Sequence, residues 1–421
     1  MIPRVQARGM RLFKAIDANL FRLVWGQGAA TFSDNILGMA LPLLAALILH
    51  ASPAQMGLLA TVEMLPWLLV TLFAGVWIDQ GSPQRVLVYS AVLRGVLLLS
   101  IPLGVWAGWF SFPWLVGVTL LIGILQVFFD LAVNAFVASA VDRNKLVGAN
   151  SQIESSRMVA RVGAPGLGGV LVQTLGGPLT ILINAVLDFV AALLLQRIPA
   201  REGPRMQNRK LIWGEIGAGL KAVLYDPYLR PLVFSTTNYN LHVGILTGIK
   251  VLFLVRELHV PPVWIGLILG AQSAGGLLGA TLAPRVSARL GLGRTAILGM
   301  LLAAMAAFVA PLVYAPPLIA AGLIAAAGFA GAVAIVVCNV NVVSLRQART
   351  APQMQGRVAA TSRFISFGLG SLGGLLGGLL AEALGLRVGM LIAALIATTA
   401  FGWLYFSPVR EVRKLPTPTE G

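Results

Sequence analysis

Long runs of apolar residues dominate this chain and constrain its fold more than any other feature. A helix that crosses a bilayer needs roughly 20 mainly apolar residues, and short turns rich in glycine, proline and serine separate the runs. We therefore predict twelve membrane spans. They cover residues 20–49, 56–77, 85–107, 113–137, 149–175, 179–196, 231–255, 264–284, 295–314, 318–343, 358–381 and 388–406.

The low charge content excludes a soluble fold. Only 11% of the 421 residues are Asp, Glu, Lys or Arg, and 57% are hydrophobic. An ordinary soluble domain has about 25% charged residues, and this chain cannot cover a core of its size with polar surface. Soluble enzymes, secreted scaffolds and disordered proteins are excluded. The first apolar run is too long for a signal peptide, so we predict an uncleaved membrane helix.

The basic residues are distributed unequally among the predicted loops. Of 31 Lys and Arg residues, 24 lie in the N-terminal segment, the even-numbered loops and the C-terminal segment, or, as Arg22 and Arg85, in the first residues of an adjoining span. Two, Arg256 and Arg387, lie in odd-numbered loops, and five lie deeper inside spans. The positive-inside rule then predicts a multi-pass protein of the bacterial inner (plasma) membrane with both termini in the cytoplasm. The net charge of +16 needs no nucleic-acid partner, and we expect the basic face to contact anionic lipid.

A polar stretch divides the spans into two groups of six. We predict a six-helix bundle over residues 1–196, a cytoplasmic linker with an amphipathic segment over 197–230, and a second six-helix bundle with a short cytoplasmic tail over 231–421. A weak repeat supports this division, because an offset of 207 residues aligns identical residues in the two halves. The aligned pairs are Asn134 with Asn341, Ser155 with Ser362, Gly163 with Gly370, and Gly166 with Gly373. Repeated bundles with a binding site between them are known from secondary transporters.

The loop after the second span resembles the signature loop of the major facilitator superfamily. A glycine, an acid four residues later, a tight turn and a basic residue occur as Gly75-Val76-Trp77-Ile78-Asp79-Gln80-Gly81-Ser82-Pro83-Gln84-Arg85. The family pattern has more basic residues, and Gln80, Ser82 and Gln84 depart from it. An acid at a helix end gains a partner in one conformation and loses it in another. We therefore predict a conformational switch at Gly75, Asp79, Gly81 and Arg85; the alternative is an ordinary helix hairpin.

Span five contains a second resemblance, to the Gly-Pro-x-x-Gly-Gly motif of the family's antiporter branches. It reads Gly163-Ala164-Pro165-Gly166-Leu167-Gly168-Gly169, with alanine at the first glycine of the motif. The resemblance implies an exporter, through Gly163, Pro165, Gly168 and Gly169. The alternative is a helix-packing face, since small residues let helices approach closely.

Further motifs look like the branch of the family that holds macrolide effluxers and the enterobactin exporter. They are Ala40-Leu41-Pro42-Leu43-Leu44, Leu65-Pro66, Leu146-Val147-Gly148-Ala149-Asn150 and Pro352-Gln353-Met354-Gln355-Gly356-Arg357-Val358. Ser33-Asp34-Asn35 is also similar to the first span of lysophospholipid transporters. The resemblance implies an all-α integral membrane fold of twelve helices in two six-helix bundles.

Acidic residues inside the spans are candidates for proton coupling. Each charge at mid-bilayer costs about 2.5–3.5 kcal/mol, so such residues must be paired, hydrated, protonated or near an edge. Asp34 lies near the middle of span one, Glu63 in the outer half of span two, and Asp130 on span four. We predict that these three exchange protons. A static buried pair is the alternative, above all for Asp130 with Arg157.

Polar residues on the spans that line the family's cavity are candidates for substrate binding. They are Gln27, Thr31, Asn35, Gln126, Asn134, Arg157, Arg161, Asn238, His242, Gln272, Asn339, Asn341 and Arg363. Arg94 and Asp188 lie in spans three and six, which the resemblance places outside the cavity. We therefore expect both to have a structural role.

No motif indicates an enzyme, a cofactor or a metal site. A Gly-x-Gly-x-x-Gly at Gly368, Gly370 and Gly373 follows no strand and lies inside a predicted span, so it is not a nucleotide loop. With Cys338 as the single cysteine, no disulfide within the chain and no cysteine metal site can form.

These observations predict a secondary transporter. We expect a monomer that exports a small amphipathic organic molecule, a drug or siderophore, by proton antiport with alternating access. Its partners would be the substrate, protons and membrane lipid. A lysophospholipid flippase, a proton-coupled importer and, from another class, a membrane enzyme or sensor are the alternatives.

Overall fold

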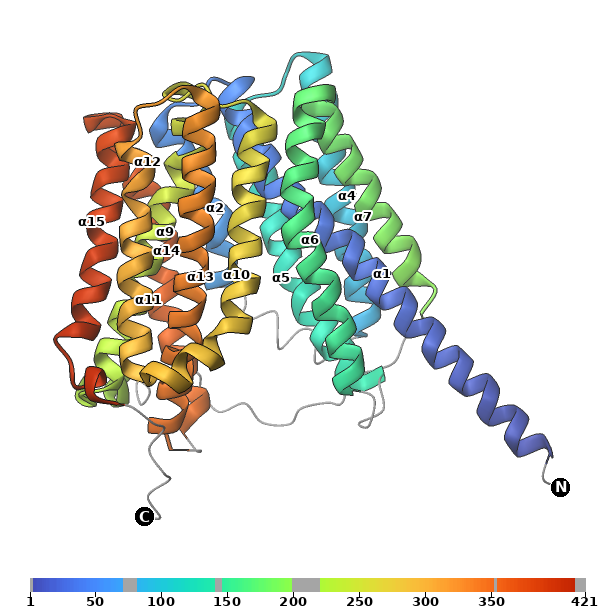
Figure 1. The fold of residues 1–421 in the computed structure, drawn as a ribbon. Helices are drawn as coiled ribbons and strands as arrows, with labels where there is room; N and C mark the ends of the chain where they lie inside the picture. The colour runs from blue at the N-terminus through green and yellow to red at the C-terminus, as the bar shows by residue number, and fades with distance from the viewer. Residues whose placement is uncertain (1–2, 71–81, 141–145, 199–219, 352–353, 413–421) are drawn as a thin grey trace. The chain divides into compact units, whose positions relative to one another are not determined.

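The computed structural model describes residues 3–70, 82–140, 146–198, 220–351 and 354–412 (Figure 1). These residues form α-helices and one short 3₁₀ helix, without a strand. Eleven of the helices are long and apolar enough to cross a membrane. The remaining predicted span, the second, begins as a helix at Pro53 but is described only to residue 70. The predicted all-α membrane fold is confirmed.

The first compact unit comprises Met1–Leu41 and Leu69–Gln207. Its core contains Leu23, Leu87, Phe129 and Leu195, each at most 1% exposed. Helix α4 packs against both α5 and α7. The helices of this unit are α1 (Pro3–Leu47, up to Leu41), α4 (Pro83–Ala107), α5 (Phe112–Ala140), α6 (Leu146–Leu175) and α7 (Gly177–Gln196).

The second compact unit comprises Pro42–Leu68 and Asn208–Gly421. In it α9 packs against α14 and α15, and α13 packs against α10 and α11. Its helices are the end of α1, α2 (Pro53–Leu69), α9 (Leu229–Arg256), α10 (Pro262–Leu290), α11 (Leu292–Ala307), α12 (Val309–Leu312), α13 (Pro317–Arg349), α14 (Gln355–Leu384), α15 (Leu386–Tyr405) and the 3₁₀ helix η3 (Pro408–Glu411).

Residues 42–68 pack with the second unit, although the sequence analysis assigned them to the first half. Glycines allow this close approach. A Cβ atom on Gly57 would lie 2.4 Å from the carbonyl oxygen of Gly374 on α14. In addition, Arg256 donates a hydrogen bond to the carbonyl oxygen of Ala51 at 2.9 Å. The division into two six-helix bundles joined by a linker over residues 197–230 stays a prediction.

Two predicted spans end differently in the structure. The eighth was predicted to end at residue 284, but α10 continues through Pro284 to Leu290. The ninth was predicted as one helix, but it is interrupted at Phe308 between α11 and α12. Pro311 lies four residues after Ala307 and has no N–H for that carbonyl, which explains the interruption.

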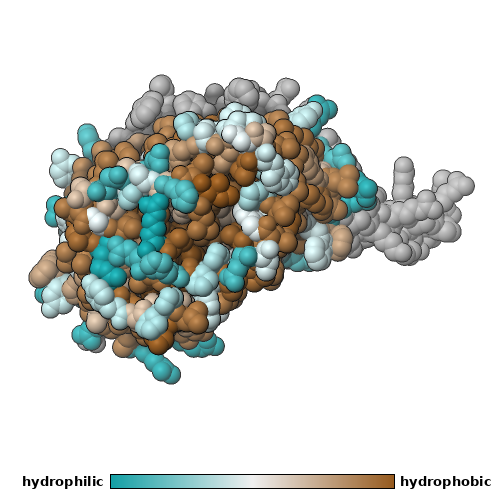
Figure 2. Space-filling view, turned by 90° about the horizontal axis from the view of Figure 1, so that it is seen from above, coloured by the Kyte–Doolittle hydropathy of each residue, from teal (hydrophilic) through white to brown (hydrophobic). Residues whose placement is uncertain are grey.

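Large apolar side chains are abundant on the surface, as expected for lipid contact. Figure 2 looks onto the ends of the helices, where polar side chains are interspersed with apolar ones. Leu103, Leu302 and Val159 are each more than half exposed. In water such a surface would drive aggregation, whereas acyl chains solvate it.

We expect Gly244→Ala to destabilise the second unit. A Cβ atom at position 244 of α9 would lie 2.0 Å from the carbonyl oxygen of Gly370 on α14, so the two helices would have to separate. Overpacking of this kind costs about 1–3 kcal/mol. Fluorescence-detected size exclusion after heating in detergent should show a lower melting temperature. The matched control is Gly322→Ala, where a Cβ atom meets nothing within 4 Å; equal melting temperatures would contradict the close contact.

Candidate functional site

A buried arginine joins four helices of the first unit. The side chain of Arg94 on α4 is 0% exposed. Its guanidinium contacts Asp34 on α1 and Gln126 on α5, and its Nε lies 3.4 Å from Asp188 Oδ2 on α7. A guanidinium has five N–H donors in a planar fork, which suits such a set of acceptors. Arg94 therefore ties α1, α5 and α7 to α4.

The polar network continues along α5. Gln126 accepts from Arg94 with its amide oxygen and donates from Nε2 to Asp130 Oδ2 at 3.0 Å. These two residues are one helical turn apart, so their side chains lie on the same face of α5. The network, which we call the Arg94 cluster, comprises Asp34, Arg94, Gln126, Asp130 and Asp188. It holds three carboxyl groups and one guanidinium.

The carboxyl groups of the Arg94 cluster differ in access. The Asp188 side chain is 0% exposed, whereas that of Asp34 is 25% exposed. Next to Asp34, Ser33 donates to the backbone carbonyl of Asn184 on α7 at 3.3 Å. This bond fixes the rotation of α1 against α7. Asp34 thus contacts the buried arginine and is also accessible from outside the cluster.

A second polar contact links α1 to α6. With its amide oxygen turned toward α6, Gln27 accepts from Arg157 Nε at 2.5 Å and from a terminal guanidinium nitrogen at 2.9 Å. Arg157 also lies 3.8 Å from Glu154, one turn earlier on α6. The direct contacts of Arg157 are with Gln27 and Glu154, and the static pair with Asp130 stays the alternative stated from sequence. Thr31 and Asn35 are half-buried and joined by a bond from the Asn35 amide to the Thr31 carbonyl at 2.7 Å.

Arg94 and Asp188, for which a structural role outside the cavity was expected, lie next to Asp34, the first candidate for proton coupling. Arg94 contacts Asp34 directly. The sequence contained a signal, because an arginine in an apolar span must find a buried acid. The two acids beside Arg94 are Asp34 on α1 and Asp188 on α7, both in the first unit. Two other candidates of the first unit, Asn134 and Arg161, are exposed.

Glu63 lies apart from these residues, on the α2 segment that groups with the second unit. Its side chain is half-buried. Among the described residues, Glu63 has neither a hydrogen bond nor an ion pair.

Three of the six cavity candidates in the second unit use their polar atoms to join helices. His242 on α9 hydrogen-bonds the carbonyl of Ala393 on α15 at 2.7 Å, and Asn238 donates to Thr399 Oγ1 at 2.9 Å. Asn341 on α13 accepts from Ser287 on α10 at 2.8 Å. The structure thus gives these three residues packing partners. Gln272 is half-buried, and Asn339 and Arg363 are exposed.

The two glycine-containing motifs are described to different extents. Gly75, Asp79 and Gly81 lie outside the described residues. Arg85 is exposed on the first turn of α4. Within α6, which contains Gly163, Pro165 and Gly169, a Cβ atom on Gly168 would lie 3.3 Å from Ile36 of α1. The close approach of α6 to α1 therefore depends on this glycine.

No group of three or more His, Cys, Asp or Glu residues suited to a metal ion occurs in the described part of the chain. Cys338 is fully buried.

The apolar helices and the charges buried among them define a multi-pass membrane protein. The model of the Major Facilitator Superfamily matches residues 23–249 and 232–421. The chain belongs to this family and is a transporter rather than an enzyme.

The relatives include proteins named as drug exporters. The "Multidrug efflux pump Tap" of Mycobacterium tuberculosis (strain ATCC 25618 / H37Rv) is 27% identical over 368 residues, which cover 84% of each chain. The pump of the same name from Mycolicibacterium fortuitum is 29% identical over 341 residues, covering 77% of this chain and 80% of that protein. The resemblance to the family's efflux branch agrees with these names.

Solved structures show the same fold. The nucleoside transporter NupG aligns with a TM-score of 0.75 at 13% identity, over 93% of this chain and 98% of that chain. A bacterial homologue of the human lysosomal transporter Spinster, in an inward-facing and unoccupied conformation, aligns with a TM-score of 0.69 at 17% identity, over 93% of this chain and 96% of that chain. At such low sequence identity, the similarity to these structures shows a shared fold and nothing about substrates.

We expect Arg94→Gln to destabilise the first unit strongly. The substitution leaves Asp34 and Asp188 without their guanidinium, and removing one partner of a buried ion pair costs about 3–5 kcal/mol. The yield of monodisperse protein and its melting temperature in detergent should fall. Asp188→Asn added to Arg94→Gln should recover part of the loss. Arg161→Gln, which removes an exposed charge from the same unit, is the control. Equal melting temperatures of Arg94→Gln and Arg161→Gln would show that the Arg94 cluster does not stabilise the fold.

Proposed function

We propose that this transporter exports a small amphipathic organic compound in exchange for protons, by alternating access. The observation that carries the proposal is the position of Asp34. Its carboxyl group contacts a fully buried arginine, while a quarter of its side chain stays accessible. A proton or a substrate can therefore reach Asp34, and the occupancy of Asp34 alters the partners of Arg94.

The Arg94 cluster suggests how the exchange would work. A proton on Asp34 removes the charge that pairs with Arg94, which then keeps Asp188 as its carboxylate partner. The free energy of the α1 to α4 contact thus depends on whether Asp34 carries a proton. A cationic or hydrogen-bonding substrate at Asp34 would compete with the proton. Asp130, joined to the cluster through Gln126, is a second proton site in this proposal, and Glu63 a third.

A drug is the favoured substrate class. The relatives named as multidrug efflux pumps support it, as does the antiporter-type glycine motif in α6. Siderophore export is supported only by the resemblance of the sequence motifs to the branch that holds the enterobactin exporter. Lysophospholipid flipping is supported by the similarity of Ser33-Asp34-Asn35 to the first span of lysophospholipid transporters. Lipid transport assayed in vesicles distinguishes the flippase from the drug exporter.

We expect Asp34→Asn to abolish transport driven by a pH gradient. Asparagine has the shape of aspartate but cannot take up and release a proton, so coupling should be lost while substrate binding persists. Uptake of a fluorescent cationic drug into proteoliposomes, with and without an imposed gradient, measures this. Glu154→Gln, which neutralises an acid of 49% exposed side chain on α6, should leave transport unchanged. Undiminished gradient-driven uptake by the Asp34 variant would rule out its coupling role.

The same proposal places both termini in the cytoplasm, following the distribution of basic residues. Cys338 is fully buried, so introduced cysteines can report the orientation. A membrane-impermeant maleimide should label Ser111→Cys, in the loop between α4 and α5, on intact cells. It should label Arg289→Cys, near the end of α10, only after permeabilisation. The reverse pattern would invert the topology.

A further inference from the structure

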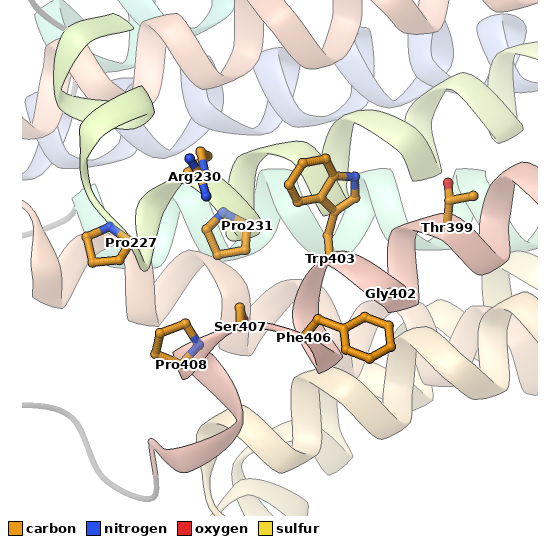
Figure 3. Close-up of a pocket in the computed structure, with 9 residues that line it drawn as sticks. All are labelled: Pro227, Arg230, Pro231, Thr399, Gly402, Trp403, Phe406, Ser407 and Pro408. Atoms are coloured by element: carbon orange, nitrogen blue, oxygen red, sulfur yellow. The ribbon is translucent and has the colours of Figure 1, made fainter.

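A pocket opens in the second unit between the beginning of α9 and the end of α15 (Figure 3). Its volume is about 470 Å³. None of the residues predicted to bind substrate lines it. The lining residues are Pro227, Arg230, Pro231, Thr399, Gly402, Trp403, Phe406, Ser407 and Pro408. At its inner end Thr399 accepts the hydrogen bond from Asn238, which joins the two helices there.

Aromatic side chains form the apolar part of this pocket. Trp403 stacks on Phe234 of α9, with ring centroids 5.1 Å apart and an interplanar angle of 23°. Phe406 is 85% exposed, at the point where α15 ends. Trp403 and Tyr405 are also partly exposed there, and such Trp and Tyr rings at the end of a spanning helix mark the boundary between hydrocarbon and water. The pocket therefore lies at the depth of lipid headgroups.

Arg230 supplies the charge. Its guanidinium is exposed and has no hydrogen bond or ion pair with any described residue. The nearby acid, Asp226, is occupied in capping the start of α9, where its Oδ1 accepts from the N–H groups of Tyr228 at 2.7 Å and Leu229 at 2.8 Å. An unpaired guanidinium beside a cavity suits a phosphate group, which it can bind through two parallel hydrogen bonds.

We propose that this pocket binds an anionic phospholipid, with the phosphate on Arg230 and the glycerol and first chain carbons against Trp403 and Phe406. The cavity is large enough for a headgroup and the start of its chains but not for a whole lipid. A lipid fits better than a soluble phosphate compound, because Phe406 is exposed at the membrane boundary. Arg349, whose guanidinium lies over the ring of Tyr228, adds a second positive charge near the start of α9, which attracts anionic lipid.

The test is lipid retention by the full-length protein. Nanodiscs of phosphatidylcholine with increasing phosphatidylglycerol are followed by native mass spectrometry after release of the protein. The wild type should retain phosphatidylglycerol in preference to phosphatidylcholine. Arg230→Gln should weaken this retention about tenfold, the effect of losing one charge-assisted contact. Its control is Arg289→Gln, which removes an exposed charge at the end of α10.

A second variant fills the pocket without changing charge. A Cβ atom on Gly402 meets nothing within 4 Å, so Gly402→Leu should fold and occupy the space of the lipid. Gly322→Leu, at a position equally open on α13, is its control and should retain lipid. Equal retention of phosphatidylglycerol by both pocket variants and both controls would overturn the proposal. Displacement of the lipid by millimolar inorganic phosphate would also overturn it, because the site would then bind a soluble anion.

Discussion

The guanidinium of Arg94 is the interaction on which the first unit depends. It has no exposed surface and contacts side chains from α1, α5 and α7. In lipid, helices gain little from hiding apolar side chains from one another, so polar contacts carry much of the specificity of packing. A buried charge allows only arrangements in which its acids remain within reach. The depth and rotation of α1 relative to α4 and α7 are fixed in this way.

The second unit is held together by different means. Glycines bring backbones into contact between α9 and α14, between α10 and α13, and between α2 and α14. The polar side chains there, such as His242 and Asn341, hydrogen-bond a neighbouring helix. A buried charge thus fixes the packing of one unit. In the other, small residues and neutral hydrogen bonds act together with partly exposed arginines, such as Arg387 with Glu257. This difference agrees with a transporter in which proton chemistry is concentrated in the first unit, as proposed.

The sequence predicted the helices well, because apolar length and turn residues act locally. It predicted that Asp34 lies near the middle of the first span, because the length of the apolar run sets that position. It also predicted that Gln126 and Asp130 share one face of α5, because they are four residues apart on a helix. It did not predict that Arg94 contacts Asp34. That contact depends on how two helices rotate about their axes, which spacing within either helix does not determine. It also missed the backbone carbonyls that bind His242 and Asn341, because any helix offers such acceptors and the sequence does not say which is near.

The contact between α2 and α14 has a mechanical consequence. Gly57 faces Gly374 and Gly378, where its nearest contacts are backbone atoms, and the Thr61 side chain of α2 lies beside Gly374. Because few side chains interlock across this seam, it can part and close again with little change of rotamers. Its attraction comes from many weak C–H to oxygen and dispersion contacts that fade within a short separation. Interlocked leucine side chains at the same place would stay in contact over a longer separation of the two helices. Separation of α2 from α14 would then be slower.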